Sequence, residues 1–231
     1  MQIIIENMVT NYEDQGNGKT LLLLHGWGDN LNTFDSLIPF LSGFRVIRLD
    51  LPGFGKTDNP PKPWFVNDYV SFVNSFVSKL NIEVDCLLGH SFGGRIAIKG
   101  VALKKLNCNK LVLINSAGIA KGSGLIGGLS KMFRWLPQGF KKKFYRAIKS
   151  DYADREELKG TFSNIISEDL KDYAKMIDVP TLIIWGKDDT QTPLADGKTF
   201  NNLIPNSQLQ IIDGGHFIHQ EKPNEVASLI L

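Results

Sequence analysis

A serine flanked by glycines, Gly-His-Ser-Phe-Gly at 89–93, follows an apolar run at 84–88 and precedes apolar residues at helical spacing. A strand that passes into a helix within one or two residues forces the turn residue into a strained conformation, and small flanking residues permit that close approach. The turn would lift the Ser91 hydroxyl clear of the sheet edge and put the first N–H groups of a helix beside it. This arrangement suits a nucleophile whose intermediate carries an oxyanion. The alternative is a glycine-rich turn with an idle serine.

A serine hydroxyl is a poor nucleophile near neutral pH and needs a base within hydrogen-bond reach. Two histidines, His216 and His219, follow the last expected strand. His216 comes directly after two glycines, so its ring would lie on a turn that can reach Ser91, and we expect it to be the base. His219 is better explained by packing in the loop or by pairing with Glu221.

The base needs an orienting carboxylate, for which Asp188 and Asp189 compete. Both follow an expected strand at the correct edge, and we favour Asp189 because it lies deeper in the loop. Asp188 is then a solvated or turn-bonding neighbour. We expect Asp213 to stabilise the turn before the base and Asp50 to fix the loop that it begins. The resulting chain order is serine, aspartate, histidine, which is one of the known orders for such a triad.

The oxyanion needs two donors. We expect the backbone N–H of Phe92, at the start of a helix, and the backbone N–H of Trp27, in the loop after an apolar strand. The remaining histidines, His25 and His90, belong to tight turns, where we expect structural hydrogen bonds.

These residues must be positioned by a sheet. Apolar runs alternating with helical patterns predict an α/β protein with a mostly parallel central sheet and helices on both faces. Chemistry in such sheets lies at the carboxyl ends of the strands, where Trp27, Asp50, Ser91 and Ser116 all lie. A turn is expected at 14–18. We expect strands at 2–8, 9–13, 20–24, 45–49, 84–88, 110–115, 181–185 and 207–212, and helices at 33–41, 66–80, after Ser91, at 194–203 and at 223–231.

The alternation stops at 117–118, and only helical patterns follow, at 129–135, 138–149, 155–166 and 169–176. We therefore predict an α/β core at 1–118 and 177–231 with a small helical cap inserted at 119–176. Residues 121–150 hold eight Lys/Arg and no Asp/Glu, whereas 151–172 hold seven Asp/Glu and three Lys/Arg. Solvated helix faces explain this charge pattern; the alternative is a basic lip that attracts anionic substrates or a lipid surface.

Composition limits the remaining possibilities. A chain of 231 residues with 42% hydrophobic and 22% charged residues is typical of a globular protein. The net charge of +2 is too small to favour nucleic-acid binding. Cys86 and Cys108 are expected as thiols, and a metal site would need more ligands. The start of the chain does not resemble a signal peptide, and no apolar run approaches the ~20 residues of a membrane span. We expect a soluble, cytoplasmic protein.

The motifs together resemble the α/β-hydrolase fold family. They are His-Gly-Trp at 25–27, Asp-Leu-Pro-Gly-Phe-Gly at 50–55, Gly-His-Ser-Phe-Gly-Gly at 89–94, Trp-Gly-Lys-Asp-Asp at 185–189 and Gly-His-Phe at 215–217. The resemblance implies Ser91 as nucleophile, His216 as base and Asp189 as acid, with no cofactor. It is nearest to a small capped branch of carboxylesterases, lactonases, meta-cleavage-product (carbon–carbon) hydrolases and cofactor-free haloperoxidases. A serine nucleophile argues against the related haloalkane dehalogenases and epoxide hydrolases, which use a carboxylate.

We therefore expect a serine hydrolase that cleaves a small carboxylic ester through an acyl-enzyme. Hydrolysis of a lactone or of the carbon–carbon bond of a vinylogous diketone is the alternative enzyme function. A ligand receptor that keeps the fold but turns over slowly is the alternative outside catalysis. The sequence leaves the acyl length, the leaving group and the oligomeric state open.

Overall fold

The structure is a computed structural model of the 231-residue chain, and it describes residues 1–120 and 156–231. Within these ranges eight strands form a sheet in the order β1-β2-β4-β3-β5-β6-β7-β8. β2 pairs antiparallel with β1 and with β4, and the other neighbours run parallel. The strands are β1 (Gln2–Ile5), β2 (Met8–Gly16), β3 (Lys19–Leu24), β4 (Phe44–Leu49), β5 (Cys86–His90), β6 (Lys110–Ile114), β7 (Thr181–Gly186) and β8 (Ser207–Ile212). The predicted α/β class with a mostly parallel sheet is confirmed.

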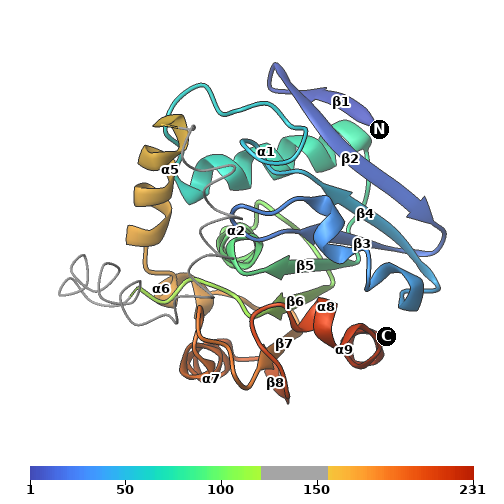
Figure 1. Ribbon diagram of the computed structural model, residues 1–231, viewed down its shortest axis with the longest axis vertical. Coiled ribbons are helices and arrows are strands. Elements are labelled where there is room, and N and C mark those ends of the chain that lie inside the picture. The colour runs from blue at the N-terminus through green and yellow to red at the C-terminus, as the bar shows by residue number, and fades with distance from the viewer. Residues whose placement is uncertain (121–155) are drawn as a thin grey trace, which may run out of the picture.

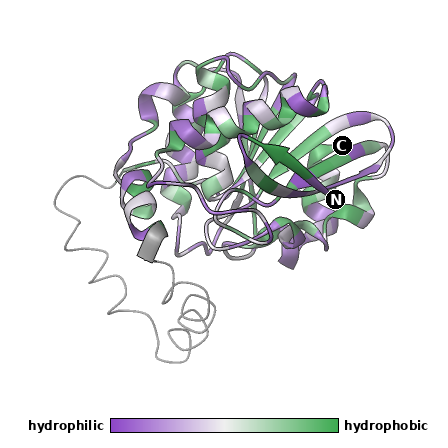
Figure 2. Cartoon of the chain, turned by 90° about the horizontal axis from the view of Figure 1, so that it is seen from above, coloured by the Kyte–Doolittle hydropathy of each residue, from purple (hydrophilic) through white to green (hydrophobic). Residues whose placement is uncertain are grey.

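Helices cover both faces of the sheet (Figure 1). Successive side chains of a strand point to opposite faces, so an apolar strand needs a covering layer on each side. In β3, Leu22 and Leu24 pack in one apolar cluster, whereas Leu21 and Leu23 pack in the other. The first cluster includes side chains of α1 (Val66–Leu80), α2 (Phe92–Ala102) and α7 (Leu194–Leu203). The second includes those of the 3-10 turn η1 (Leu31–Phe34) and of α8 (Ile218–Glu221) and α9 (Pro223–Ile230). Apolar strands thus lie inside a layer of more polar helix surfaces (Figures 1 and 2).

The N-terminal strand boundaries were predicted wrongly. β1 ends at Ile5, and Glu6 and Asn7, with φ of 48° and 65°, make the turn into β2. β2 then continues to Gly16, so its last three residues occupy the first part of the turn expected at 14–18. Pairing with β4 extends it, and the Arg45 guanidinium donates two hydrogen bonds to the Asp14 carboxylate across that pair.

The prediction of an α-helix at 33–41 is also wrong. Two short 3-10 turns, η1 and η2 (Ile38–Phe40), occupy the segment instead. Pro39 explains the difference, because its ring blocks an α-helical hydrogen bond and clashes with the carbonyl four residues earlier. Phe34, Leu37 and Leu41 are nevertheless buried. The apolar pattern therefore predicts the packing face correctly, but it predicts the wrong type of helix.

Two helices of the expected insertion are described: α5 (Glu156–Ser167) and α6 (Lys171–Ala174). They overlap the predictions at 155–166 and 169–176, the second being shorter than expected. The Thr161 hydroxyl accepts a hydrogen bond from the Trp64 backbone N–H at 2.9 Å, which ties α5 to the loop before α1. The predicted helices at 129–135 and 138–149, the basic segment and the beginning of the acidic one lie outside the described residues.

Neither cysteine is in a disulfide, as expected. Burial raises the pKa of the Cys86 thiol to about 12 and that of the Cys108 thiol to about 11, so both stay protonated near neutral pH. In the described ranges, no helix has the length and apolar character needed to cross a membrane.

Candidate active site

Ser91 lies at the junction of β5 and α2 with φ of 49° and ψ of −109°, a backbone conformation that non-glycine residues rarely adopt. The packing around it requires glycine. A Cβ on Gly93 would lie 2.0 Å from the Leu24 carbonyl oxygen, and one on Gly89 would lie 2.5 Å from the Gly93 carbonyl oxygen. The expectation that these two glycines allow the strand and helix to approach closely is confirmed.

Backbone hydrogen bonds from the neighbouring strand hold this turn. The Ser91 N–H donates to the Ile114 carbonyl at 3.1 Å, at the end of β6. The Ser91 carbonyl accepts from the N–H groups of Gly94 at 3.1 Å and Ala117 at 3.0 Å. Strain at the serine is therefore balanced by three fixed contacts at the carboxyl edge of the sheet.

Asp189 and His216 meet at the same edge. The Nδ1 of His216 lies 2.7 Å from Asp189 Oδ2, and both residues are buried. Because the carboxylate accepts this bond, Nδ1 carries the proton and Nε2 is left to accept a hydrogen bond from a hydroxyl such as that of Ser91. Asp188 is exposed, and its N–H donates to the Gly214 carbonyl. Of the two competing aspartates, only Asp189 bonds to this histidine.

The other late histidine points elsewhere. His219 Nε2 lies 3.2 Å from Thr33 Oγ1, and the ring is completely buried between α8 and η1. The alternative pairing of His219 with Glu221 is wrong, since the Glu221 carboxylate accepts from the Gly215 N–H at 2.8 Å. The role expected for Asp213 differs too, because this exposed carboxylate pairs with Lys187 at 3.6 Å.

His90 connects the serine turn to the base. Its Nε2 donates to the His216 carbonyl at 3.0 Å, and the two ring centroids are 4.9 Å apart. Since His90 directly precedes Ser91, this contact brings the loop of His216 to the turn. Among the described residues no hydrogen bond joins Ser91 Oγ to the His216 ring; such bonds are often long before substrate binds.

Hydrogen bonds keep the Asp189 carboxylate ionised. Burial alone would raise its pKa, but hydrogen bonds and charge at His216, together with bonds from Thr192 and Asn115, outweigh burial and lower it. Asp189 Oδ1 accepts from the N–H groups of Gln191 at 2.7 Å and Thr192 at 2.9 Å. Oδ2 accepts from His216, from the Thr192 hydroxyl at 2.7 Å and from the Asn115 amide.

The sequence pattern predicts neither the Asn115 contact nor the Thr192 contact. It places Asn115 at the end of an expected strand and assigns no role to Thr192. The available signal was position, because Asn115 directly follows β6 at the carboxyl edge. Nothing in the local sequence indicated that its side chain would reach residues more than seventy positions away.

The two expected oxyanion donors belong to segments next to the serine: Phe92 follows it directly, and a Cβ on Gly26, the residue before Trp27, would lie 3.4 Å from Ser91 Cβ. Phe92 is the first residue of α2, where backbone N–H groups have no partner within the helix. Trp27 follows β3, and its ring packs edge-on against Phe54 at 4.9 Å and Phe92 at 5.3 Å. Phe162 of α5 adds a third ring at 5.2 Å. The Trp27 ring thus lies in a cluster of three other aromatic rings, from the loop after β4, from α2 and from α5.

The two histidines expected in tight turns, His25 and His90, both make structural hydrogen bonds, that of His90 being the bond to the His216 carbonyl described above. His25 Nδ1 lies 2.7 Å from the Gly26 carbonyl, and its Nε2 accepts from the Leu51 N–H at 2.9 Å. Asp50 fixes the loop that it begins, accepting from the N–H groups of Leu31 at 2.7 Å and Lys56 at 2.9 Å. Both roles stabilise the loops around Trp27.

A model of the alpha/beta hydrolase family matches residues 21–229, most of the chain. The chain belongs to this family. Hydrolase activity is the general assignment that membership gives.

Curated relatives and solved structures agree with it. The chain is 28% identical to the AB hydrolase superfamily protein YisY of Bacillus subtilis, over 97% of this chain and 95% of that protein. It is 27% identical to the 2-hydroxy-6-oxo-6-(2'-aminophenyl)hexa-2,4-dienoic acid hydrolase of Metapseudomonas resinovorans, over 96% and 86%. The structure of a meta-cleavage product hydrolase from Pseudomonas fluorescens IP01 superposes with a TM-score of 0.80 at 25% identity, over all of this chain and 95% of that one.

Buried histidines make the stability of this hydrolase depend on pH. The ring centroids of His90 and His219 are 4.4 Å apart with the rings tilted by 56°, and each ring has an Nδ1 without a partner among the described residues. Burial, to which the neighbouring His216 adds, lowers the pKa of His219 to about 3. Burial and the neighbouring His219 and His216 lower the pKa of His90 well below 6.5. Neither ring accepts a proton in the folded protein near neutral pH.

We expect the free energy of unfolding to fall steeply below pH 6.5. In the unfolded chain both histidines titrate near pH 6.5, so the unfolded state gains protons that the folded state excludes. Each group then removes roughly 1.4 kcal/mol of stability per pH unit between pH 6.5 and its folded-state pKa. Asp189 adds nothing in this window, because a lowered carboxyl pKa costs stability only near and below pH 3.8.

Urea unfolding at pH 7.5, 6.5, 5.5 and 5.0 measures this slope. In His219→Gln, which keeps a polar group beside Thr33, the contribution of His219 disappears and the slope becomes shallower, while His90 and the buried His25, whose pKa burial also lowers, still contribute. A free energy of unfolding that stays constant from pH 7.5 to 5.0 would contradict neutral burial of these rings.

Proposed function

We propose that this protein is a serine hydrolase that cleaves a small carboxylic ester, or a related acyl compound, through an acyl-enzyme. Ser91 is the nucleophile, His216 the general base and Asp189 the orienting acid. The backbone N–H groups of Trp27 and Phe92 form the oxyanion hole. No cofactor or metal is needed.

In this mechanism Ser91 Oγ attacks the ester carbonyl carbon while its proton passes to His216 Nε2. The carbonyl oxygen becomes an oxyanion between the two N–H groups. The tetrahedral intermediate collapses, the carbon–oxygen bond to the leaving group breaks, and the alcohol takes the proton from the imidazolium. Water then attacks the acyl-enzyme by the same route, so the carboxylic acid leaves and Ser91 regains its proton.

The observation that carries the proposal is the buried hydrogen bond of 2.7 Å between His216 Nδ1 and Asp189 Oδ2. It lies beside the His90 contact that leads to Ser91. A buried carboxylate with a lowered pKa stabilises the imidazolium that forms when Ser91 loses its proton. A serine held at φ of 49° at the start of a helix supports the same roles.

Cleavage of a carbon–carbon bond or of a lactone is the second candidate. It is supported by the 27% identity to a hydrolase named for a hexa-2,4-dienoic acid. A solved enol-lactonase from Burkholderia xenovorans LB400 has a TM-score of 0.81, but at 20% identity it shows only a shared fold.

We also propose that residues 119–176 form a cap over the site and that 1–118 and 177–231 form the core. The contact of Phe162 with the Trp27 ring supports a cap that reaches the aromatic side of the site. A small-molecule substrate and a cytoplasmic location complete the proposal.

A substrate panel distinguishes the candidates. Purified protein is assayed with p-nitrophenyl esters of increasing acyl length, with N-acyl homoserine lactones and with a dienoate ring-fission product. We expect kcat/KM to be highest for short esters, since the rings of Phe54, Phe92 and Phe162 that pack against Trp27 would limit the space for an acyl chain beside it. Turnover of the dienoate alone would replace the ester proposal with the second candidate, and ligand binding without any turnover would favour a receptor.

A further inference from the structure

Asn115 lies where three chain segments meet. It directly follows β6, is completely buried, and has φ of 44°. Its N–H donates to the Ile184 carbonyl at 3.0 Å, so it is bonded to β7. Asparagine tolerates this left-handed conformation better than most residues, because its short polar side chain forms local hydrogen bonds.

Each atom of its amide group has a partner. Oδ1 accepts from the Gly186 N–H at 3.1 Å, at the end of β7. Nδ2 donates to Asp189 Oδ2 and to the Gly215 carbonyl, the latter at 3.1 Å. The opposite orientation would place Oδ1 against two acceptors and the NH₂ group against an N–H, so the hydrogen bonds allow only one.

This amide differs from the other side-chain donor, Thr192. The Thr192 hydroxyl lies 2.7 Å from Asp189 Oδ2 and 3.1 Å from the Asn115 carbonyl. It has a single proton, which serves only one of these acceptors at a time. Asn115 has two amide protons and bonds at once to the acid and to the residue before His216.

We propose that Asn115 is a positioning residue that locks the acid loop to the base loop and sets the basicity of the Asp189–His216 pair. The proposal rests on the roles given above to Asp189 and His216. Its Nδ2 holds Asp189 Oδ2 toward the His216 ring and, through Gly215, fixes the turn from which that ring projects.

The effect on basicity has a definite sign. A donor to the carboxylate stabilises its charge, so the carboxylate attracts the proton on His216 less strongly. Loss of the Asn115 amide therefore makes Asp189 more basic and raises the pKa of His216. The other titratable groups around this ring are His90 on β5 and His219 on α8, with Glu221 bonded to the preceding loop, and no hydrogen bond joins any of them to Asn115 among the described residues.

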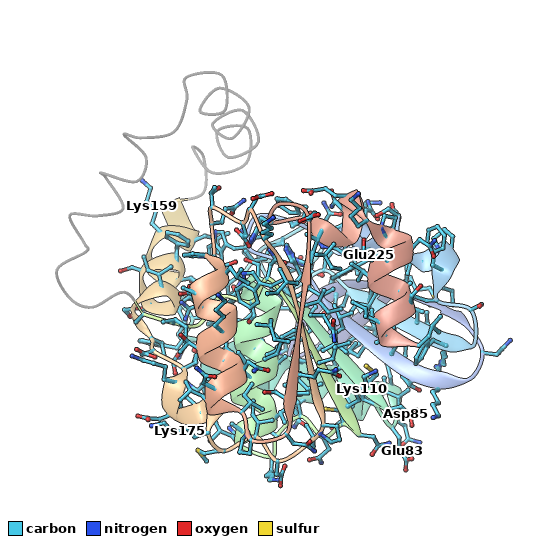
Figure 3. All side chains as sticks on the ribbon, turned by 90° about the horizontal axis from the view of Figure 1, so that it is seen from below. Glu83, Asp85, Lys110, Lys159, Lys175 and Glu225 are labelled. Carbon is cyan, nitrogen blue, oxygen red and sulfur yellow. The ribbon has the colours of Figure 1, made fainter. Side chains whose placement is uncertain are left out.

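Two variants isolate the amide. Asn115→Gly removes the side chain without strain at φ of 44°, and Asn115→Asp keeps its shape but replaces the donor with a second carboxylate oxygen. Asn109→Asp is the matched control. Asn109 Nδ2 also donates to a carboxylate, Asp85 Oδ1 at 3.3 Å, but Asp85 lies where β5 begins, at the opposite edge of the sheet (Figure 3).

The decisive measurement is an NMR titration of the His216 ring in the unliganded protein, assigned with His216→Gln. We expect the His216 signal to move to a higher titration midpoint in Asn115→Gly, further in Asn115→Asp, and not at all in Asn109→Asp. On the best ester, kcat should fall about tenfold with little change in KM. The acidic limb of the profile of kcat/KM against pH should move toward higher pH in the same two variants.

A folded Asn115→Gly protein with an unshifted His216 pKa would reduce Asn115 to a structural residue and overturn the proposal. The titration needs no turnover. If the wild-type protein hydrolyses nothing, the proposed function fails, and the ring titration still decides the role of Asn115.

Discussion

Replacing Ser91 with alanine should lower ester hydrolysis by on the order of 10⁴-fold or more. The alanine keeps the Cβ and the backbone contacts of the turn but has no oxygen to attack the carbonyl. What remains is catalysis by the oxyanion donors and by binding, which does not restore a covalent route. The loss corresponds to about 5.5 kcal/mol of barrier, far more than the loss of one hydrogen bond.

Ser116→Ala is the matched control, because Ser116 lies at the same sheet edge and is completely buried. Its hydroxyl donates to the Ala117 carbonyl at 3.0 Å, so its loss removes a serine oxygen near the site without touching the proposed nucleophile. We expect kcat within a few-fold of wild type for Ser116→Ala. Equal activity in Ser91→Ala and wild type would remove Ser91 from the mechanism.

Replacing Asp189 with asparagine should lower kcat by roughly 10⁴-fold. Four donors besides the ring converge on this carboxylate: two N–H groups, the Thr192 hydroxyl and the Asn115 amide. An asparagine would direct its own NH₂ group at some of them and would lose the charge that stabilises the His216 imidazolium. The neutral side chain should also move the acidic limb of the pH profile toward lower pH, since the imidazolium forms less readily without the carboxylate charge.

Asp188→Asn provides the comparison for that loss. It makes the same change of charge one residue away, at an exposed carboxylate. We expect kcat and the pH profile of Asp188→Asn to match those of wild type. If both variants lost activity equally, a general effect of charge in this loop would explain the result better than a specific acid at 189.

The sheet and the serine turn could be predicted from the sequence because their signals are local. An apolar run such as 21–24 is typical of a strand covered on both faces, and the glycines around Ser91 follow from the space between β5 and α2. The segment at 33–41 shows the limit of periodicity. Its apolar spacing is helical, yet Pro39 stops an α-helix from forming.

Contacts that depend on tertiary structure could not be predicted in this way. Asn115 bonds to Asp189 and Gly215, which are distant in sequence and meet only when β6, β7 and β8 lie side by side. The choice between Asp188 and Asp189 was argued from depth in the loop, whereas the hydrogen bonds around Thr192 supply the physical reason. The length of β2 likewise depends on pairing with β4.

The proposed activity requires one nucleophilic serine at the carboxyl edge of this sheet. Incubation with a fluorophosphonate probe, followed by intact-protein mass and peptide mapping, shows which serine forms the covalent adduct. We predict a single adduct on the peptide containing Ser91, absent from Ser91→Ala and greatly slowed in His216→Gln. An unmodified wild-type protein, or an adduct that persists in Ser91→Ala, would contradict the account.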